Sequence, residues 1–483
     1  MRKFALTLSI LLYLTACARA PVPQVEPTAA SADPTSPPAQ YATVPPETLI
    51  KATVESSLLA TEWQGNPEGN VLFPMDPTNG TALPDYMPVS LGQTFFHAFS
   101  PDRRTLAVMS FPNENAYDGS LLLIDLEAWK TQRFELGLSG WVSNMVFSPD
   151  GKGLAIAHGH TAHKLTIVDV EKGVVTAQRK TDSGFVSRLK FTKDGAALML
   201  YAPVVQNRFT ENEMSAGPPR IFLLNASNLN LLWSVEGSEI RDGIFPRDEN
   251  VTPLNIHEPG QAYYINPGVV FAPDGDVLYI VHADSEKLTT VDFEQQNVET
   301  VDIQTKDTWF EKLLSLTAGV AHAKIGDGII RQAAISPDGQ FLYVAGMNNI
   351  TYKDKQGNWQ MEQTPLGLEI IQTRNGLRVA HIETDTTELS LSPDGRFLYL
   401  RSWGNYKDQL PWTEIVETSS YQQVARSDNV SATPALLMNG EYLLVSTFST
   451  SEYSHHMSIL NPDGSNVLAE WTSPHSIWWL ITQ

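Results

Sequence analysis

Cysteine is almost absent from this chain, because its 483 residues contain only Cys17. A single cysteine excludes an internal disulfide, a zinc site built from several cysteines, and the Cys-x-x-Cys-His attachment of haem. Four other motifs are missing as well: Gly-x-Gly-x-x-Gly, the Walker loop, His-Glu-x-x-His and Gly-x-Ser-x-Gly. Dinucleotide, nucleotide, zincin and α/β-hydrolase functions therefore lose their usual sequence support.

Positive charge is also scarce. The chain has 54 acidic and 33 basic residues, a formal net charge of −21. Loss of residues 1–16 would remove Arg2 and Lys3 but no carboxylate, which moves the charge to −23. Such a surface repels phosphate backbones, so we expect no nucleic-acid partner.

The apolar run near the N-terminus, Phe4–Leu14, is too short to cross a bilayer as a helix. With the basic start at Arg2 and Lys3 and the small-residue stretch before Cys17, it predicts a secretory signal over residues 1–16. Leu14-Thr-Ala-Cys17 resembles a bacterial lipobox. The resemblance implies that Cys17 is diacylated and anchors an exported protein to the cell membrane or outer membrane. The protein would then face the periplasm or the cell exterior, and Ala18 favours the outer membrane where there are two.

After the cysteine, residues 17–47 are rich in Pro, Ala, Ser and Thr. This composition cannot bury a core and predicts a tether between the membrane and the folded part. Residues 48–483 remain for one large domain, which two polar or irregular stretches interrupt as insertions, 237–266 and 306–329.

The feature that the sequence has in abundance is a repeated hairpin. Its clearest copy is Ile335–Gly346, in which Pro-Asp-Gly reverses the chain and Phe341–Val344 leaves as an apolar strand. Six further copies begin at Phe99, Phe147, Phe191, Phe271, Leu391 and, in degenerate form, Leu437. The turn aspartates Asp150 and Asp194 are 44 residues apart. This spacing matches a propeller blade of roughly 40–50 residues.

A second pair of strands follows each hairpin, for example Leu121–Asp125 with Thr131–Leu136. Seven units of four strands predict an all-β fold, a seven-bladed β-propeller of four-stranded antiparallel blades. The apolar segment Ile477–Ile481 is left over, and we expect it to pair inside the ring near Leu58–Phe73. An eighth, composite blade made from these two ends is the alternative.

The repeats resemble those of YVTN-type β-propellers, most closely in Leu278-Tyr-Ile-Val with Leu288–Asp292 and in Leu342-Tyr-Val. The resemblance extends from about Gln93 to Trp471. It implies the fold, but it leaves the function open, because such propellers include lactonase-like enzymes, parts of dehydrogenases and plain binding modules.

Within a blade the four antiparallel strands follow one another in order from the axis outward. The Pro-Asp-Gly turns, which join first and second strands, therefore all lie on one rim, here called the turn rim. The connections between second and third strands and those between blades lie on the opposite rim, here called the crown. Both insertions belong to the crown, together with Pro203–Pro219 and Met347–Pro365, which we expect to be long loops. The second insertion begins with Thr308-Trp309-Phe-Glu311, a capping box that predicts a short amphipathic helix.

Histidines on the crown are the candidate ligand-binding residues. His158, His160 and His163 lie within six residues, and three imidazoles could bind a divalent metal, although loop histidines are more often solvated. His282 and Asp284 follow a buried strand, where Asp284 could equally cap the next turn. The candidate face also includes His257 and Trp309. No cofactor is predicted, and a divalent metal is the alternative.

Two functions are consistent with this pattern. The first is a lipid-anchored binding module that recognises a protein, peptide, glycan or small molecule on the crown. The second is a lactonase-like or dehydrogenase-associated enzyme with a site at the axial mouth of that face. The metal or catalytic residues of such enzymes cannot be matched here, which favours binding. Converging carboxylates and imidazoles would favour the enzyme, and exposed aromatic or apolar side chains the binding module.

Overall fold

We analysed a computed structural model of the chain. The structure describes residues 58–63, 69–76, 81–111, 118–159, 163–181, 186–208, 213–246, 262–305, 328–353, 356–357, 359–392, 394–402, 412–428, 435–436, 443–449, 454–473 and 477–481. The chain divides into two units, residues 1–50 and 51–483, and every described residue belongs to the second. No helix in the described ranges has the length and hydropathy needed to cross a membrane.

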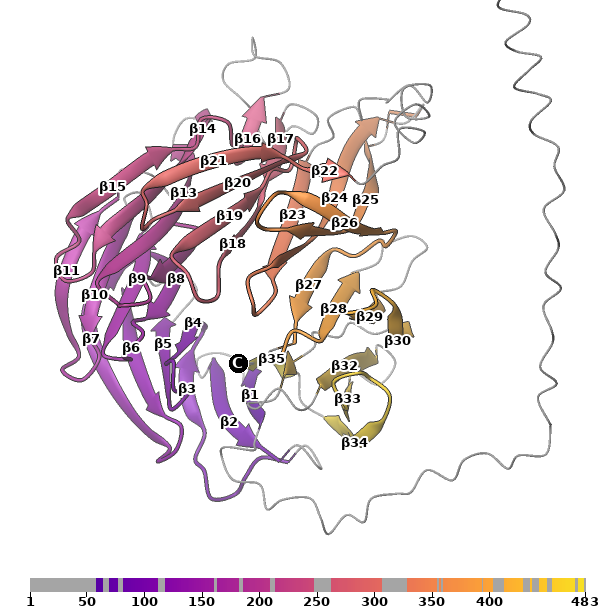
Figure 1. The fold of residues 1–483 in the computed structure, drawn as a ribbon. Helices are drawn as coiled ribbons and strands as arrows, with labels where there is room; N and C mark the ends of the chain where they lie inside the picture. The colour runs from indigo at the N-terminus through magenta and orange to yellow at the C-terminus, as the bar shows by residue number, and fades with distance from the viewer. Residues whose placement is uncertain are drawn as a thin grey trace, which may run out of the picture. The chain divides into compact units, whose positions relative to one another are not determined.

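Strands grouped in fours account for most of the described chain (Figure 1). Blade 1 comprises β4 (Thr94–Phe99), β5 (Thr105–Phe111), β6 (Asp118–Asp125) and β7 (Lys130–Ser139). Blade 2 comprises β8 (Trp141–Phe147), β9 (Gly153–Gly159), β10 (Lys164–Asp169) and β11 (Val174–Lys180). Blade 3 comprises β12 (Arg188–Phe191), β13 (Ala197–Arg208), β14 (Glu213–Asn225) and β15 (Leu231–Glu236). Blade 4 comprises β18 (Gly268–Phe271), β19 (Val277–Val281), β20 (Lys287–Asp292) and β21 (Asn297–Asp302).

The second half of the chain continues the pattern. Blade 5 comprises β23 (Gly328–Ile335), β24 (Phe341–Lys353), β25 (Trp359–Gln372) and β26 (Leu377–Ile382). Blade 6 comprises β27 (Glu388–Leu391), β28 (Phe397–Ser402), β29 (Trp412–Glu417) and β30 (Gln423–Asp428). Blade 7 comprises β31 (Ala435–Leu436), β32 (Leu443–Ser449), β33 (Ser454–Leu460) and β34 (Val467–Ser473). Neighbouring strands within each of these blades pair antiparallel.

One more group is made from both ends of the described chain. Its strands are β35 (Ile477–Ile481), β1 (Leu58–Trp63), β2 (Asn70–Met75) and β3 (Val89–Gly92), paired in that order. The C-terminal strand pairs antiparallel with β1, with Leu59 opposite Ile481 and Ala60 opposite Leu480. The described strands thus form seven groups that are continuous along the chain and an eighth, composite group.

Apolar clusters join each group to the next. Alternate residues of each strand face the blades on its two sides, so a blade buries one face against its predecessor and the other against its successor. The clusters between blades 2 and 3 and between blades 3 and 4, for instance, take opposite faces of β13, through Leu198 and Met199 respectively. The composite group is packed on both sides, with Met457 of blade 7 against Phe73 and Leu106 of blade 1 against Leu72.

Three short strands lie outside the four-stranded pattern. β16 (Gly243–Pro246) and β17 (Ala262–Asn266) form a hairpin, and β17 pairs parallel with β23, the inner strand of blade 5. β22 (Gln304–Thr305) pairs parallel with β26, the outer strand of the same blade. Both additions come from the connections before and after blade 4.

These observations confirm the prediction of an all-β fold with four-stranded antiparallel blades. They also place the apolar segment Ile477–Ile481 as predicted, in the ring beside β1. The predicted amphipathic helix at Thr308–Glu311 lies outside the described residues, and so do the signal peptide and the tether.

Candidate binding face

One hydrogen-bond pattern of the turn rim is common to blades 1, 2, 3, 5 and 6. In blade 5, the Ser336 hydroxyl donates to Asp338 Oδ1 at 2.5 Å and accepts the backbone N–H of Phe341 at 2.9 Å. The same pair of bonds occurs at Ser100 and Asp102, Ser148 and Asp150, Thr192 and Asp194, and Ser392 and Asp394. The hydroxyl hydrogen bond is the main cause that lowers the pKa of Asp338. These turns are short and satisfy their own polar groups, which leaves little chain for a partner.

Two hairpins project on the crown. In blade 3, β13 and β14 remain paired as far as Arg208 and Glu213. In blade 5, β24 and β25 remain paired as far as Lys353 and Trp359. Each pair shows a register shift in mid-strand, and a β-bulge of this kind bends a ribbon without ending its pairing.

The sequence-based expectation for these regions is therefore wrong where the chain is described. Pro203–Pro219 and Met347–Pro365 were expected to be long loops, but most of their described residues are paired strand. Proline and polar residues suggested a loop because a strand that leaves the core no longer alternates apolar and polar residues. Backbone pairing continues nevertheless, because it satisfies the N–H and C=O groups without a buried face.

The segment after β15 carries several charged contacts of the crown. Glu239 binds Lys287 of blade 4, with 2.9 Å between the carboxylate and Nζ. Arg241 lies 3.5 Å from Asp284, also in blade 4, and its guanidinium lies 4.4 Å from the centre of the Phe245 ring. Asp284, a predicted site residue, thus holds this segment on the neighbouring blade.

Asp242, in the same segment, is buried, with 5% of its surface exposed. The Tyr201 hydroxyl donates to its Oδ2 at 2.8 Å. Burial raises the pKa of Asp242 to about 6, although the Tyr201 hydrogen bond and the Arg188 charge oppose the shift. Burial also raises the pKa of Tyr201. A carboxyl group that changes charge near neutral pH therefore lies directly before β16, and the sequence analysis did not single it out.

A second charged cluster joins blades 4 and 5. Glu369 on β25 is 5% exposed and binds Arg331 on β23, at 2.6 Å, and Arg378 on β26. Both arginines also reach Glu286, in the connection between β19 and β20. Burial would raise the pKa of Glu369, but the two guanidinium charges outweigh it and lower the pKa. This cluster links the crown of blade 4 to the first, third and fourth strands of blade 5.

The buried histidines occupy equivalent places in blades 2 and 4. His158 Nε2 lies 2.9 Å from Thr166 Oγ1, and His282 Nε2 lies 2.8 Å from Thr289 Oγ1. Each threonine also shares a hydrogen bond with a side chain of the fourth strand. Burial lowers the pKa of His282, so its ring is neutral at pH 7. The repetition indicates that both histidines satisfy polar groups inside their blades.

The same third-strand position holds a glutamate in the next two blades, Glu369 and Glu414. The third-strand sequence is Leu165-Thr-Ile-Val in blade 2 and Leu288-Thr-Thr-Val in blade 4. It is Leu368-Glu-Ile-Ile in blade 5 and Thr413-Glu-Ile-Val in blade 6. An acidic residue inside an apolar strand seldom stays buried without a basic partner. This substitution in the repeat was the signal that these strands need basic partners, although it does not identify the partners.

The other predicted site residues are only partly placed. His163 directly precedes β10. Its backbone carbonyl accepts the Thr181 N–H at 2.9 Å. His160, His257 and Trp309 lie outside the described residues. Within the described part, no group of three or more His, Cys, Asp or Glu side chains could hold a metal. The metal site therefore stays a prediction, because one of its three histidines is not described.

Three large apolar side chains are exposed on inner strands or on β17, which pairs with the inner strand β23. Trp141 is the first residue of β8 and is 53% exposed. Tyr264 on β17 and Ile330 on β23 are 47% and 38% exposed. Tyr264 lies opposite Gly328 in the parallel register, and a Cβ on that glycine would contact it, so Tyr264 and Ile330 share one face.

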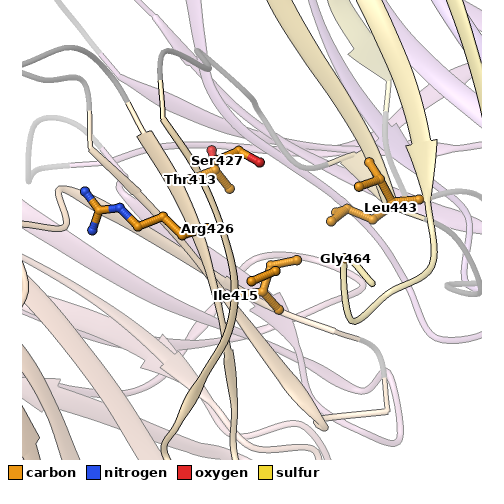
Figure 2. Close-up of a pocket in the computed structure, with 8 residues that line it drawn as sticks. Thr413, Ile415, Arg426, Ser427, Leu443 and Gly464 are labelled. Carbon is orange, nitrogen blue, oxygen red and sulfur yellow. The ribbon is translucent and has the colours of Figure 1, made fainter. Parts of the chain in front are cut away.

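A cavity between blades 6 and 7 is lined by Thr413, Ile415, Ala425, Arg426, Ser427, Leu443, Leu460 and Gly464 (Figure 2). Its volume is about 20 Å³, which is room for about one water molecule. Figure 2 shows the Arg426 side chain pointing away from Leu443 and Gly464. This cavity is a packing gap and not a ligand site.

No protein-family model and no curated protein matches the sequence. In fold, the chain is similar to dihydro-haem d1 dehydrogenase NirN in complex with DHE, with a TM-score of 0.53 and 11% identity over 89% of this chain and 76% of that one. It is also similar to hydrazine synthase from Kuenenia stuttgartiensis, with a TM-score of 0.43 and 14% identity over 77% of this chain and 96% of that one. The β-propeller domain of Cps50 (Swd1) from Myceliophteria thermophila gives a TM-score of 0.41 and 12% identity over 77% and 96%.

These likenesses concern the fold alone. Four-stranded antiparallel blades that pack face to face, together with the similarity to the NirN structure, define the chain as a β-propeller protein.

Proposed function

We propose that this chain is a lipid-anchored binding module that holds its partner on the crown over blades 2 to 5. The observation that carries the proposal is the difference between the two rims. The described turns of the turn rim are short, and those of blades 1, 2, 3, 5 and 6 have internal side-chain hydrogen bonds. Three of the described additions, the two ribbons and the β16–β17 hairpin, extend the crown.

The exposed side chains support binding over catalysis. Trp141, Tyr264 and Ile330 offer apolar surface near the axis, and exposed aromatic side chains are enriched at binding sites. Several described acidic and basic groups of the crown pair with one another, as Glu239 does with Lys287 and Arg241 with Asp284. Exposed apolar side chains together with paired charges favour a module that recognises a protein, peptide, glycan or small molecule.

The path of the chain is consistent with presentation of this face. An inner strand runs from the crown to the turn rim, so Ile481 at the end of β35 lies at the turn rim. Leu59 pairs with it, so β1 begins at the turn rim too. Both ends of the described chain therefore lie on the rim opposite the crown.

Anchoring is tested by Cys17→Ser. We expect the variant to leave the membrane fraction and accumulate as a soluble or unprocessed form, because a lipobox without its cysteine cannot be acylated. Fractionation with and without detergent measures this. Unchanged, detergent-dependent membrane association of the variant would refute the anchor.

The binding face is tested by site-specific photocrosslinking in the native host. A photoreactive phenylalanine analogue in place of Trp141 or Tyr264 should give discrete crosslinked species. The same analogue in place of Glu127, an exposed residue in a turn of blade 1 on the turn rim, is the matched control and should give none.

Binding must then be reproduced with the purified components. Trp141→Ala with Tyr264→Ala should weaken binding of the identified partner at least about tenfold, since loss of central aromatic contacts typically costs 2 kcal/mol or more. Adducts formed from Glu127 alone would place the partner on the turn rim, and full affinity in the double variant would show that these aromatic side chains do not bind it. Either result would contradict the proposal.

An enzyme with a site at the axial mouth is the second candidate. The observation that favours it is the pKa of Asp242, near 6, because acids and bases in catalysis have shifted pKa values. A general acid must reach its substrate, however, and the Asp242 side chain is only 5% exposed. This observation makes binding the better supported function.

A further inference from the structure

The segment between β15 and β17 is held to the ring by contacts of two kinds. Apolar contact is made by Ile240, which is 3% exposed and packs in the core shared by blades 3 and 4. Charged contact is made by Glu239 with Lys287 and by Arg241 with Asp284. Neither ion pair contains a histidine.

Asp242 is the exception in this segment. It lies between Ile240 and the first residue of β16, and the Tyr201 hydroxyl of β13 is hydrogen-bonded to it at 2.8 Å. The other charged group that acts on it is Arg188 of β12, on the same blade. The described residues contain no ion pair to Asp242, so its ionised form would be a buried carboxylate with a single hydroxyl donor among them.

We propose that Asp242 is a proton-controlled latch that holds the base of the β16–β17 hairpin on blade 3. When the carboxyl group is protonated, it can remain buried against Tyr201 without the cost of a buried charge. When it is ionised, undocking of the segment hydrates the carboxylate. The hairpin carries Tyr264, so the latch would adjust the order of the crown beside the axis.

The sign of the pH dependence follows from the two states. The docked carboxyl has a pKa of about 6, against the ordinary 3.8 once the segment is undocked. The docked state therefore binds the proton more tightly, and docking is favoured at low pH. It weakens as the pH rises from about 4 through about 6, and it changes little above that.

One nearby group also titrates. His282 lies on blade 4 and interacts electrostatically with Glu239, and burial lowers its pKa. Its change of charge therefore falls below its ordinary pKa of 6.5, and its Nε2 is bonded to Thr289. A variant at Asp242 is needed to separate the two groups.

Amide hydrogen exchange in β16 and β17 measures the latch on the whole chain. After correction for intrinsic rates, the opening constant should rise on the order of tenfold between pH 5 and pH 7.5, as the two pKa values of Asp242 require. Asp242→Asn cannot ionise, so it should remove this dependence and keep the protection at pH 7.5. Glu299→Gln, which removes an exposed carboxylate on β21, is the control and should retain it.

Tyr201→Phe separates a latch from simple packing. The hydroxyl favours the ionised carboxylate, so its removal should move the midpoint of the exchange transition to higher pH. Three results would overturn the proposal: equal protection of the wild type at both pH values, a midpoint near 4, or an unchanged pH dependence in Asp242→Asn. The first two need only the wild type, so they remain decisive if a variant fails to fold. None depends on a partner of the crown.

Discussion

At the residue scale, the same third-strand position carries two different solutions to burial of a polar group. Blades 2 and 4 place a threonine there and satisfy it with a histidine. Blades 5 and 6 place a glutamate there and satisfy it with arginine, through Arg331 and Arg378 in blade 5. A buried charged group interacts more strongly with its partner than a neutral group does, but loss of that partner also lowers the stability of the fold more.

The first prediction concerns Glu369. Glu369→Gln should lower the free energy of unfolding by about 3 to 5 kcal/mol, because it leaves two largely buried guanidinium groups without their shared carboxylate. Urea denaturation at pH 7 measures the loss. Since the folded pKa of Glu369 is lowered, its contribution is present above the ordinary value of 4.5 and is lost as the pH falls through the lower, folded pKa.

Glu286→Gln is the matched control, because it removes one charge from the same cluster where the side chain is 57% exposed. We expect a change within about 1 kcal/mol there. Equal effects of the two variants would mean that the buried carboxylate contributes no more than the exposed one.

At the element scale, the hairpins of the two rims are stabilised in different ways. On the turn rim, the hydroxyl of Ser336 and the carboxylate of Asp338 fix the reversal, so a short sequence pattern is sufficient to position it. On the crown, β13 with β14 and β24 with β25 continue by backbone pairing beyond the core. A ribbon of this kind is permissive in its side chains, which suits a surface that has to match a partner.

At the scale of the whole molecule, the composite group decides how the ring closes. β35 is its inner strand, and without it Ala60 and Thr61 of β1, both fully buried, would form the edge. Closure by strands from both ends of the chain ties the first and last blades together, since neither can move away without loss of β-sheet pairing.

The tail supplies the corresponding prediction. Deletion of residues 476–483 should lower the melting temperature markedly and the free energy of unfolding by at least about 3 kcal/mol, because it removes a paired inner strand and uncovers buried side chains. Calorimetry measures both. Deletion of residues 482–483 alone spares β35 and should have little effect, and an unchanged melting temperature in the longer deletion would show that the tail is not a clasp.

The sequence by itself determined the repeat. Pro-Asp-Gly turns followed by apolar strands, as at Ile335–Gly346, carry their own local instructions, so the fold class and the strands of each blade could be predicted. It also predicted that Ile477–Ile481 would pair inside the ring, because an apolar strand left exposed would aggregate. His282 and Asp284 could be assigned to the crown because the order of strands in a blade fixes the rim.

Only the tertiary structure decided which polar groups meet. The pairs of Arg241 with Asp284 and Arg331 with Glu369 join residues 38 or more positions apart, and no local pattern specifies such contacts. The burial of Asp242 against Tyr201 likewise depends on how the segment after β15 folds back on blade 3. The strands can be predicted from the pattern of apolar residues along the chain. The burial and the pKa of a polar group, in contrast, depend on side chains that the ring brings together from different blades.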